Sequence, residues 1–253
     1  MKIPQDLVIR VITDDIIDRV INGGTDTYHM ALPQTAATRI AGIIPPSPSV
    51  SQLGILMLDG SGSMADENAP GSGVTKADAV LSATRDFVEV LKASRLKDSF
   101  WLAANAFSIS TTNMLPISRD YIKITDLDPT AIRSPTAVFP AKQNTDIVLA
   151  LTKASEIMGG FLRDSTIPVD SKYRKVVVIL LSDGLHNVGE VDEVYGRAQE
   201  ISSMWPFCTV AFGNSANVNL LRGIVVDERY FLQTADSNKL RSFFVNSTTR
   251  ERR

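Results

Sequence analysis

The stretch at residues 53–64, LGILMLDGSGSM, constrains the fold of this chain more than any other part of the sequence. An apolar run ends abruptly at Asp59, and glycine and serine then alternate up to Ser63. An apolar run of this length, bounded by turn residues, predicts a strand that is buried on both faces of a parallel sheet. The residues after it should lie on the loop at the carboxyl end of that strand, where open α/β sheets bind their ligands.

Three oxygen-bearing side chains alternate along this loop, from Asp59, Ser61 and Ser63. The intervening glycines favour a tight turn, so that the three side chains can converge on one point. One carboxylate and two hydroxyls suit a hard cation such as Mg²⁺ or Ca²⁺. The same residues are also good turn formers, and a turn needs no metal, so this stretch alone leaves both interpretations open.

The segment DGSGSM resembles the Asp-x-Ser-x-Ser signature of von Willebrand factor A domains, in which a metal ion-dependent adhesion site follows the first strand. The resemblance implies a threonine at the start of a helix midway along the chain and an aspartate at the end of a later hydrophobic strand. Thr145 in QNTDIVLALTKA and Asp183 in VVVILLSDGLHN match these two features in the expected order. The resemblance covers residues 52–246, and the chain is most similar to the intracellular, prokaryotic type.

The alternation of strands and helices predicts the fold class independently. It indicates an α/β protein with a doubly wound, mostly parallel central sheet and helices on both faces. The expected strands after the first are residues 99–107, 175–182, 207–212 and 230–233, and the expected helices are 76–94, 145 onward, 192–204, 218–226 and 237–245. Residues 111–119 should form a short edge strand because they contain a proline, while residues 121–141 and 159–174 are expected to be irregular connections.

The predicted domain boundaries follow from these elements. Residues 1–50 form a small, mostly β appendage that ends in a proline-containing linker, residues 51–247 form the A domain, and residues 248–253 form a basic tail. The appendage contains a second candidate for the metal threonine, Thr25 in GGTD. We favour Thr145, because Thr25 precedes the first strand and a proline interrupts the segment after it.

Charge and cysteine content exclude several classes of partner. The net charge is −2, and basic residues cluster only at Arg250, Arg252 and Arg253, which argues against a nucleic-acid groove. The single Cys208 allows no internal disulfide and fits a reducing compartment. No apolar stretch has the length of a membrane span or the pattern of a signal peptide, so we expect a cytoplasmic protein without a membrane partner.

The resemblance also implies a mechanism. The ion, expected to be Mg²⁺ with Mn²⁺ or Ca²⁺ as alternatives, would be held by hydroxyls and by two carboxylates on the exposed rim of the sheet. Largely neutral ligands leave such an ion electron-poor, so it can take a carboxylate from an Asp or Glu of a partner protein. Prokaryotic members often work with an ATPase or a kinase–phosphatase pair, and the resemblance admits such a partner. The implied ligands are Asp59, Ser61, Ser63, Thr145 and Asp183.

Two other classes of function remain open from the sequence. A metal-dependent hydrolase or phosphotransferase also places an aspartate after the first strand of such a sheet, but Ser61 occupies the position of its usual second carboxylate. The chain has no glycine-rich GKS or GKT loop and no Gly-x-Ser-x-Gly elbow that would make His186 part of a catalytic triad. A purely structural domain without metal dependence is the other alternative. We therefore expect a binding protein and not an enzyme.

Overall fold

The computed structural model describes residues 50–68, 71–139, 144–183, 186–214 and 216–249. The predicted appendage at residues 1–50, its linker prolines and Thr25 lie almost wholly outside the described residues, as does most of the basic tail. No helix within the described ranges is long and apolar enough to cross a bilayer.

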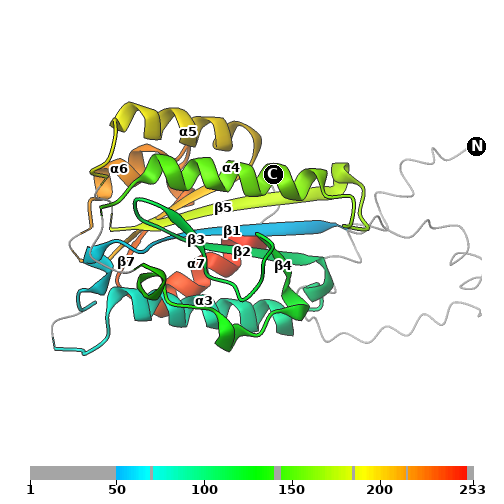
Figure 1. The fold of residues 1–253 in the computed structure, drawn as a ribbon, viewed down its shortest axis with the longest axis horizontal. Coiled ribbons are helices and arrows are strands. Elements are labelled where there is room, and N and C mark those ends of the chain that lie inside the picture. Colours follow the sequence, from blue (N-terminus) through cyan, green and yellow to red (C-terminus); the bar gives the residue numbers. More distant parts are fainter. Residues whose placement is uncertain (1–49, 69–70, 140–143, 184–185, 215, 250–253) are drawn as a thin grey trace, which may run out of the picture. The chain divides into compact units, whose positions relative to one another are not determined.

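A seven-stranded, mostly parallel sheet forms the centre of the described region (Figure 1). The strand order is β3-β2-β1-β5-β6-β7, and the short β4 pairs with β2. The pairs of β1 with β2 and β5, of β5 with β6, and of β6 with β7 are parallel, whereas β3 and β4 run antiparallel to β2. The strands are β1 (Ser51–Asp59), β2 (Phe100–Phe107), β3 (Thr111–Asn113), β4 (Ile122–Lys123), β5 (Arg174–Ser182), β6 (Phe207–Phe212) and β7 (Phe231–Thr234).

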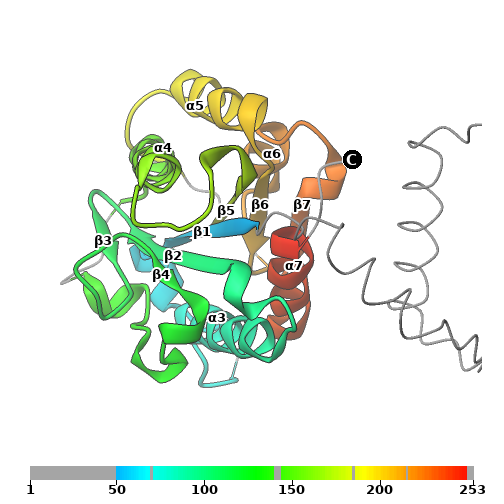
Figure 2. The ribbon, with the colours of Figure 1, turned by 90° about the vertical axis from the view of Figure 1, so that its right-hand side faces the viewer.

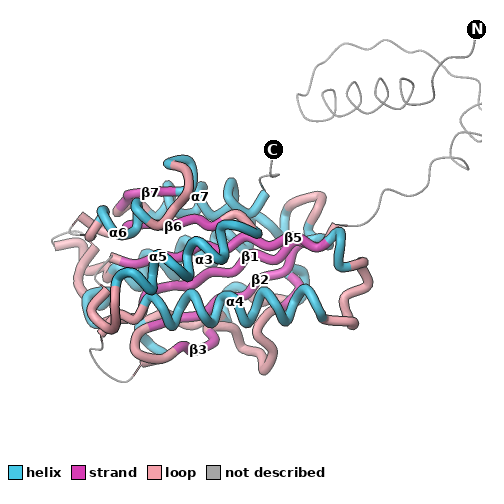
Figure 3. The backbone as a smooth tube through the Cα atoms, turned by 90° about the horizontal axis from the view of Figure 1, so that it is seen from above, coloured by secondary structure: helices cyan, strands magenta, loops and turns pink. Residues whose placement is uncertain are grey.

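Helices cover both faces of the sheet, as the sequence pattern predicted. Helices α3 (Lys76–Ala93) and α7 (Ser237–Thr249) lie on one face, and α4 (Ile147–Arg163), α5 (Val191–Met204) and α6 (Val218–Gly223) lie on the other (Figure 2). Seen from above, α4 and α5 run along the strands that they cover (Figure 3). Short 3₁₀ turns complete the described elements: η1 (Gly62–Ala65), η2 (Lys97–Ser99), η3 (Ile124–Asp126), η4 (Pro129–Ala131), η5 (Thr136–Val138), η6 (Ser171–Tyr173) and η7 (Glu228–Tyr230).

Strand β1 contributes to two separate hydrophobic cores. Leu56 and Leu58 pack with α3 and α7, whereas Leu53, Ile55 and Met57 pack with α4. This alternation follows from the two-residue period of a strand that is covered on both faces. The apolar run that opens the sequence analysis is therefore the centre of the molecule, and its carboxyl end is fixed by packing on both sides.

Two predicted boundaries differ from the structure because tertiary contacts extend a helix. Helix α4 continues through Gly159 and Gly160 to Arg163, where a connection was expected, because Phe161 is fully buried and its ring meets those of Trp101 and Tyr121 edge to face. Helix α7 continues to Thr249, and the Gln52 side chain of β1 donates a hydrogen bond to the Thr248 carbonyl oxygen. Residues 248 and 249 are thus helical rather than part of a tail.

The buried guanidinium of Arg174 links the end of α4 to the sheet through hydrogen bonds. Arg174, the first residue of β5, is 6% exposed. It donates hydrogen bonds to four carbonyl oxygens in the last turn of α4 and in the connection to β5, those of Phe161, Leu162, Ile167 and Val169, at 2.8–3.2 Å. These oxygens lie at or beyond the last turn of α4, where helical i→i+4 hydrogen bonds end, and the Phe161 oxygen also accepts from the Asp164 N–H.

We expect Arg174→Leu to lower the free energy of unfolding by about 3 kcal/mol, since it leaves several buried carbonyl oxygens unpaired. The matched control is Arg229→Leu, which removes an exposed guanidinium paired with Asp227 and should leave the free energy of unfolding nearly unchanged. Urea unfolding followed by circular dichroism measures both. Equal losses in the two variants would contradict the role assigned to Arg174.

Candidate metal centre

The site begins with Asp59, whose carboxylate lies inside the protein. The residue is fully buried. Its Oδ1 accepts a hydrogen bond from the Ser61 backbone N–H at 2.8 Å, and its Oδ2 accepts one from the Ser182 hydroxyl at 2.6 Å. Burial raises the pKa of the Asp59 carboxyl from 3.8 to about 6; the hydrogen bonds from Ser182 and Ser61 oppose this shift, and the negative charge of Asp183 adds to it.

The two motif serines lie side by side. Ser61 immediately precedes η1 and Ser63 lies within it, and their Oγ atoms are 3.1 Å apart. Ser61 is 2% exposed and Ser63 is half-buried. Met64, which follows them, is fully buried in the core against α3 and so anchors the turn. The motif loop therefore presents a carboxylate and two hydroxyls from one fixed segment.

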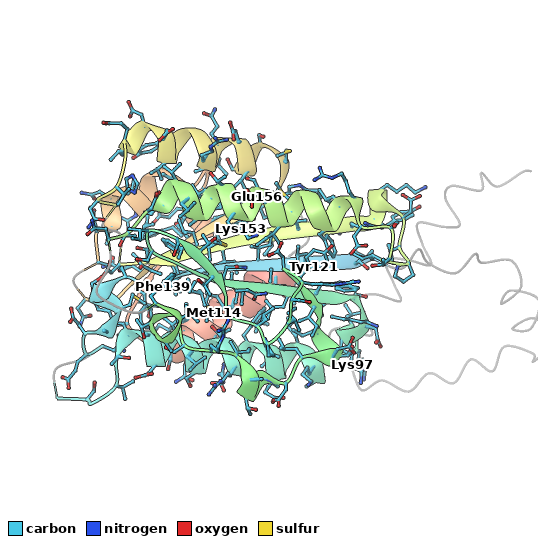
Figure 4. All side chains as sticks on the ribbon, viewed as in Figure 1. Lys97, Met114, Tyr121, Phe139, Lys153 and Glu156 are labelled. Carbon is cyan, nitrogen blue, oxygen red and sulfur yellow. The ribbon has the colours of Figure 1, made fainter. Side chains whose placement is uncertain are left out.

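Gly60 is required for close approach of another loop. Its backbone N–H donates to the Phe107 carbonyl oxygen at the end of β2. A Cβ atom at this position would lie 2.6 Å from both the Phe139 ring and the Pro135 carbonyl oxygen. Figure 4 shows Phe139 toward the end of the molecule at which β1 leads into η1. The first glycine of the motif is therefore needed because a side chain would not fit, and not because of its backbone conformation, since its φ is not positive.

Thr145 is held at the same edge of the sheet by its backbone. Its N–H donates to Asn187 Oδ1 at 2.7 Å, and its carbonyl oxygen accepts from the Asn187 N–H at 3.2 Å. On the other side lies Ser108, directly after β2. Its backbone carbonyl oxygen accepts a hydrogen bond from the Asp146 N–H, and its hydroxyl donates one to the Asn144 carbonyl oxygen. Thr145 is 2% exposed. It is therefore fixed between the ends of β2 and β5.

Asp183 follows the last residue of β5. In the parallel register Leu58 lies beside Leu181, which brings Ser182 level with Asp59. Asp183 is 3% exposed, and its Oδ2 forms an ion pair with Lys76 Nζ at 3.5 Å. Its Oδ1 is buried and has no hydrogen-bond partner among the described residues.

The expectation that Asp59 and Asp183 lie on an exposed rim is wrong. Both carboxylates are buried, because helices cover both faces of the sheet up to the carboxyl ends of β1 and β5. Two carboxylates out of water need compensating positive charge or hydrogen bonds. Their burial makes isosteric amide variants, rather than alanine variants, the appropriate tests.

Several residues of the site escaped the sequence analysis. Lys76 was expected only as the start of a helix, and Ser182 only as the end of a strand. Asn187 lies beyond the aspartate motif, where an asparagine is unremarkable in a loop. His186 Nδ1 accepts a hydrogen bond from the Ile147 N–H. On the loop after the motif, the Glu67 carboxylate accepts a hydrogen bond from the Gly71 N–H.

The donor set fits a hard divalent cation. Hydroxyl and carboxylate oxygens are the ligands of Mg²⁺ and Mn²⁺. Asp183 Oδ1, which has no hydrogen-bond partner among the described residues, is a buried acceptor that a cation would satisfy. Within the described ranges there is no group of three or more His, Cys, Asp or Glu side chains that could hold a metal. A cation here would consequently rely on two carboxylates and on neutral hydroxyls.

Comparison with known proteins identifies the fold. The sequence matches no family model and no curated protein. A von Willebrand factor type A structure from Catenulispora acidiphila is similar, with a TM-score of 0.57 and 15% identity over 80% of this chain and 44% of the other. The described part of the chain therefore has the von Willebrand factor A fold, which confirms the fold expected from the motif.

Two further similar structures carry metals. The manganese-loaded TRAP protein of Plasmodium vivax has a TM-score of 0.56 and 17% identity over 79% of this chain and 75% of the other. Proximal thread matrix protein 1 from the mussel byssus, with a zinc-occupied adhesion motif, has a TM-score of 0.52 and 17% identity over 78% of this chain and 47% of the other. None of the three is described as an enzyme. The chain spans about half the length of the first solved structures it matches, which are 48% and 47% covered.

Stability without metal should depend on the protonation of Asp59. Because the pKa is raised on folding, the native state binds the proton more tightly, so stability should fall as the pH rises from about 4 to about 6 and then level off. Asp59→Asn preserves the shape and removes the charge, so in EDTA it should exceed the wild type by about 3 kcal/mol at pH 7 and by little at pH 4.

Urea unfolding in EDTA across this pH range measures the difference. Asp98→Asn, which changes a carboxylate that is 71% exposed, is the control and should parallel the wild type. Parallel profiles for Asp59→Asn and the wild type would contradict the buried-carboxylate account.

Proposed function

We propose that this chain binds one divalent cation, Mg²⁺ in the first instance, at Asp59, Ser61, Ser63, Thr145 and Asp183. The observation that carries the proposal is the burial of two carboxylates at the adjacent ends of β1 and β5, beside the loops that carry three hydroxyl side chains. Asp183 Oδ1 has no partner there among the described residues. A cation would satisfy that oxygen and offset the charge of Asp59. The metal-carrying structures of the same fold support the choice of a divalent ion.

The proposed role of the ion is to capture a carboxylate of a partner protein. Three of the five side chains are uncharged, so they neutralise little of the ion's charge and leave it able to attract an anionic oxygen. The ion would supply charge-assisted ligation, while the chain's own residues hold it and orient its open position. Ser63 is half-buried whereas the other four residues are almost fully buried, so the open position lies on the Ser63 side.

The proposal assigns the chain to protein binding and gives it no catalytic step. The partner would contribute an exposed Asp or Glu, and a complex with an ATPase or with a kinase–phosphatase pair is one arrangement that this chemistry allows. A cytoplasmic location remains part of the same proposal.

Loss of the Thr145 hydroxyl should weaken cation binding. We expect Thr145→Ala to raise the dissociation constant for Mg²⁺ or Mn²⁺ at least about tenfold, since changes even beyond the direct ligands of a metal cost that much. Thr145→Ser retains the hydroxyl and should bind nearly as the wild type does. Thr25→Ala, at the other candidate threonine, should have no effect.

Titration calorimetry measures these affinities. A cation at ten times its dissociation constant should also stabilise the wild type by about 1.4 kcal/mol, a melting shift of roughly 2–4 °C for a domain of this size. Absence of any binding heat and of any melting shift for the wild type would refute the metal centre, and equal affinities for Thr145→Ala and Thr145→Ser would remove Thr145 from it.

Partner capture should require the cation. Affinity capture from the native cell in Mg²⁺ should retain a partner that EDTA releases, and Asp183→Asn should lose the partner although it remains folded by circular dichroism. The exposed Asp98→Asn variant is the control. Mutation of the partner's contacting Asp or Glu to its amide should cause the same loss, because an amide cannot supply the charged ligand. Capture that persists in EDTA would place binding on another surface.

A further inference from the structure

A lysine lies inside the proposed centre. Lys76 is 5% exposed, and its Nζ is 3.5 Å from Asp183 Oδ2. Lysine is among the residues least often buried, and burial of its charge is costly unless the charge is paired. Among the described residues the ammonium has Asp183 as its partner, at a distance longer than the 2.7–2.9 Å that is usual for a charge-assisted hydrogen bond. The ammonium therefore offsets Asp183 without satisfying it fully.

Three segments of the chain hold Lys76 in this place. Its backbone N–H donates to the Asp66 carbonyl oxygen just beyond the motif turn, and the preceding Thr75 caps α3 by accepting from the Asp78 N–H. Its aliphatic stem packs over Gly213 at the end of β6, where an added Cβ would lie 3.0 Å from Lys76 Cε. Gly213 has a φ of +104°, which other residues rarely adopt. The hydrogen-bonded backbone of Lys76 and the backbone conformation of Gly213 thus keep the lysine side chain directed at the centre.

We propose that Lys76 is a resident cation of this centre that weakens the binding of a divalent ion and strengthens the attraction of the loaded centre for an acidic ligand. The inference rests on the proposed metal-binding function. With both carboxylates ionised, the charges of Asp59, Asp183 and Lys76 sum to −1. A divalent ion changes this sum to +1, whereas without the lysine the loaded centre would be neutral. Like charges close together in a buried site repel strongly.

The charge balance couples the ion to the acidic ligand. A carboxylate returns the loaded centre to neutrality, so the ion and the carboxylate should each bind more tightly when the other is present. By linkage the two enhancements are equal in free energy. Lys76 would make retention of the ion conditional on capture of a ligand, and it would do so without contacting that ligand.

The test measures Mn²⁺ affinity with and without acetate, which serves as the carboxylate probe. In the wild type, acetate should tighten Mn²⁺ binding. Lys76→Met should bind Mn²⁺ alone about tenfold more tightly than the wild type, equivalent to about 1.4 kcal/mol, and acetate should enhance its affinity less. Lys92→Met is the matched control: it removes an ammonium from the same helix, one that donates to the Leu127 carbonyl oxygen, and it should behave as the wild type does.

The outcomes separate this inference from the metal centre itself. Wild-type Mn²⁺ binding with an equal or weaker affinity in Lys76→Met would overturn the role of Lys76 and leave the proposed function intact. Binding by Lys76→Met but not by the wild type would refute the proposed function and, with it, the inference that rests on that function. No binding by either protein would overturn both. If Lys76→Met does not fold, Lys76→Gln, which keeps a hydrogen-bond donor, replaces it. Failure of acetate to tighten Mn²⁺ binding by the wild type would also overturn the inference, and this measurement needs no variant.

Discussion

Burial of the Asp59 carboxylate at the end of β1 is the constraint on which the rest of this structure depends. Because helices cover both faces of β1, the residue that ends the strand remains inside the protein. The Ser61 N–H and the Ser182 hydroxyl offset part of the cost of burying it, yet the pKa stays raised to about 6. The loops after β1, β2 and β5 are consequently arranged around a negative charge that the neighbouring dipoles do not fully compensate.

The surrounding loops are fixed by backbone bonds rather than by side chains alone. Asn187 and Ser108 hold the segment around Thr145 from both sides, and Gly60 allows the loop that carries Phe139 to close over the motif. Hydroxyl groups that are held in this way need little rearrangement to meet an ion, which is the general condition for a well-formed binding site.

The sequence predicted those features that local pattern determines. The apolar run before Asp59 and the later run before Asp183 identified the two central strands, because only a doubly covered strand tolerates such a run. Burial of the two aspartates, the continuation of α4 past Gly159 and the presence of Lys76 in the centre were missed, because each depends on residues more than a hundred positions away or on packing against another layer. No local signal marks Lys76, since a lysine at the start of a helix is normally solvated.

The distribution of charge argues against an ion pair that has simply replaced a metal. In such a replacement, positively charged side chains would balance both carboxylates and the site would be neutral. Here the ammonium pairs with Asp183 Oδ2, while Asp183 Oδ1 has no hydrogen-bond partner among the described residues and Asp59 has a raised pKa. Lys76 therefore compensates one aspartate, so that the centre can fold without an ion, and the charge that remains on Asp59 still favours a cation.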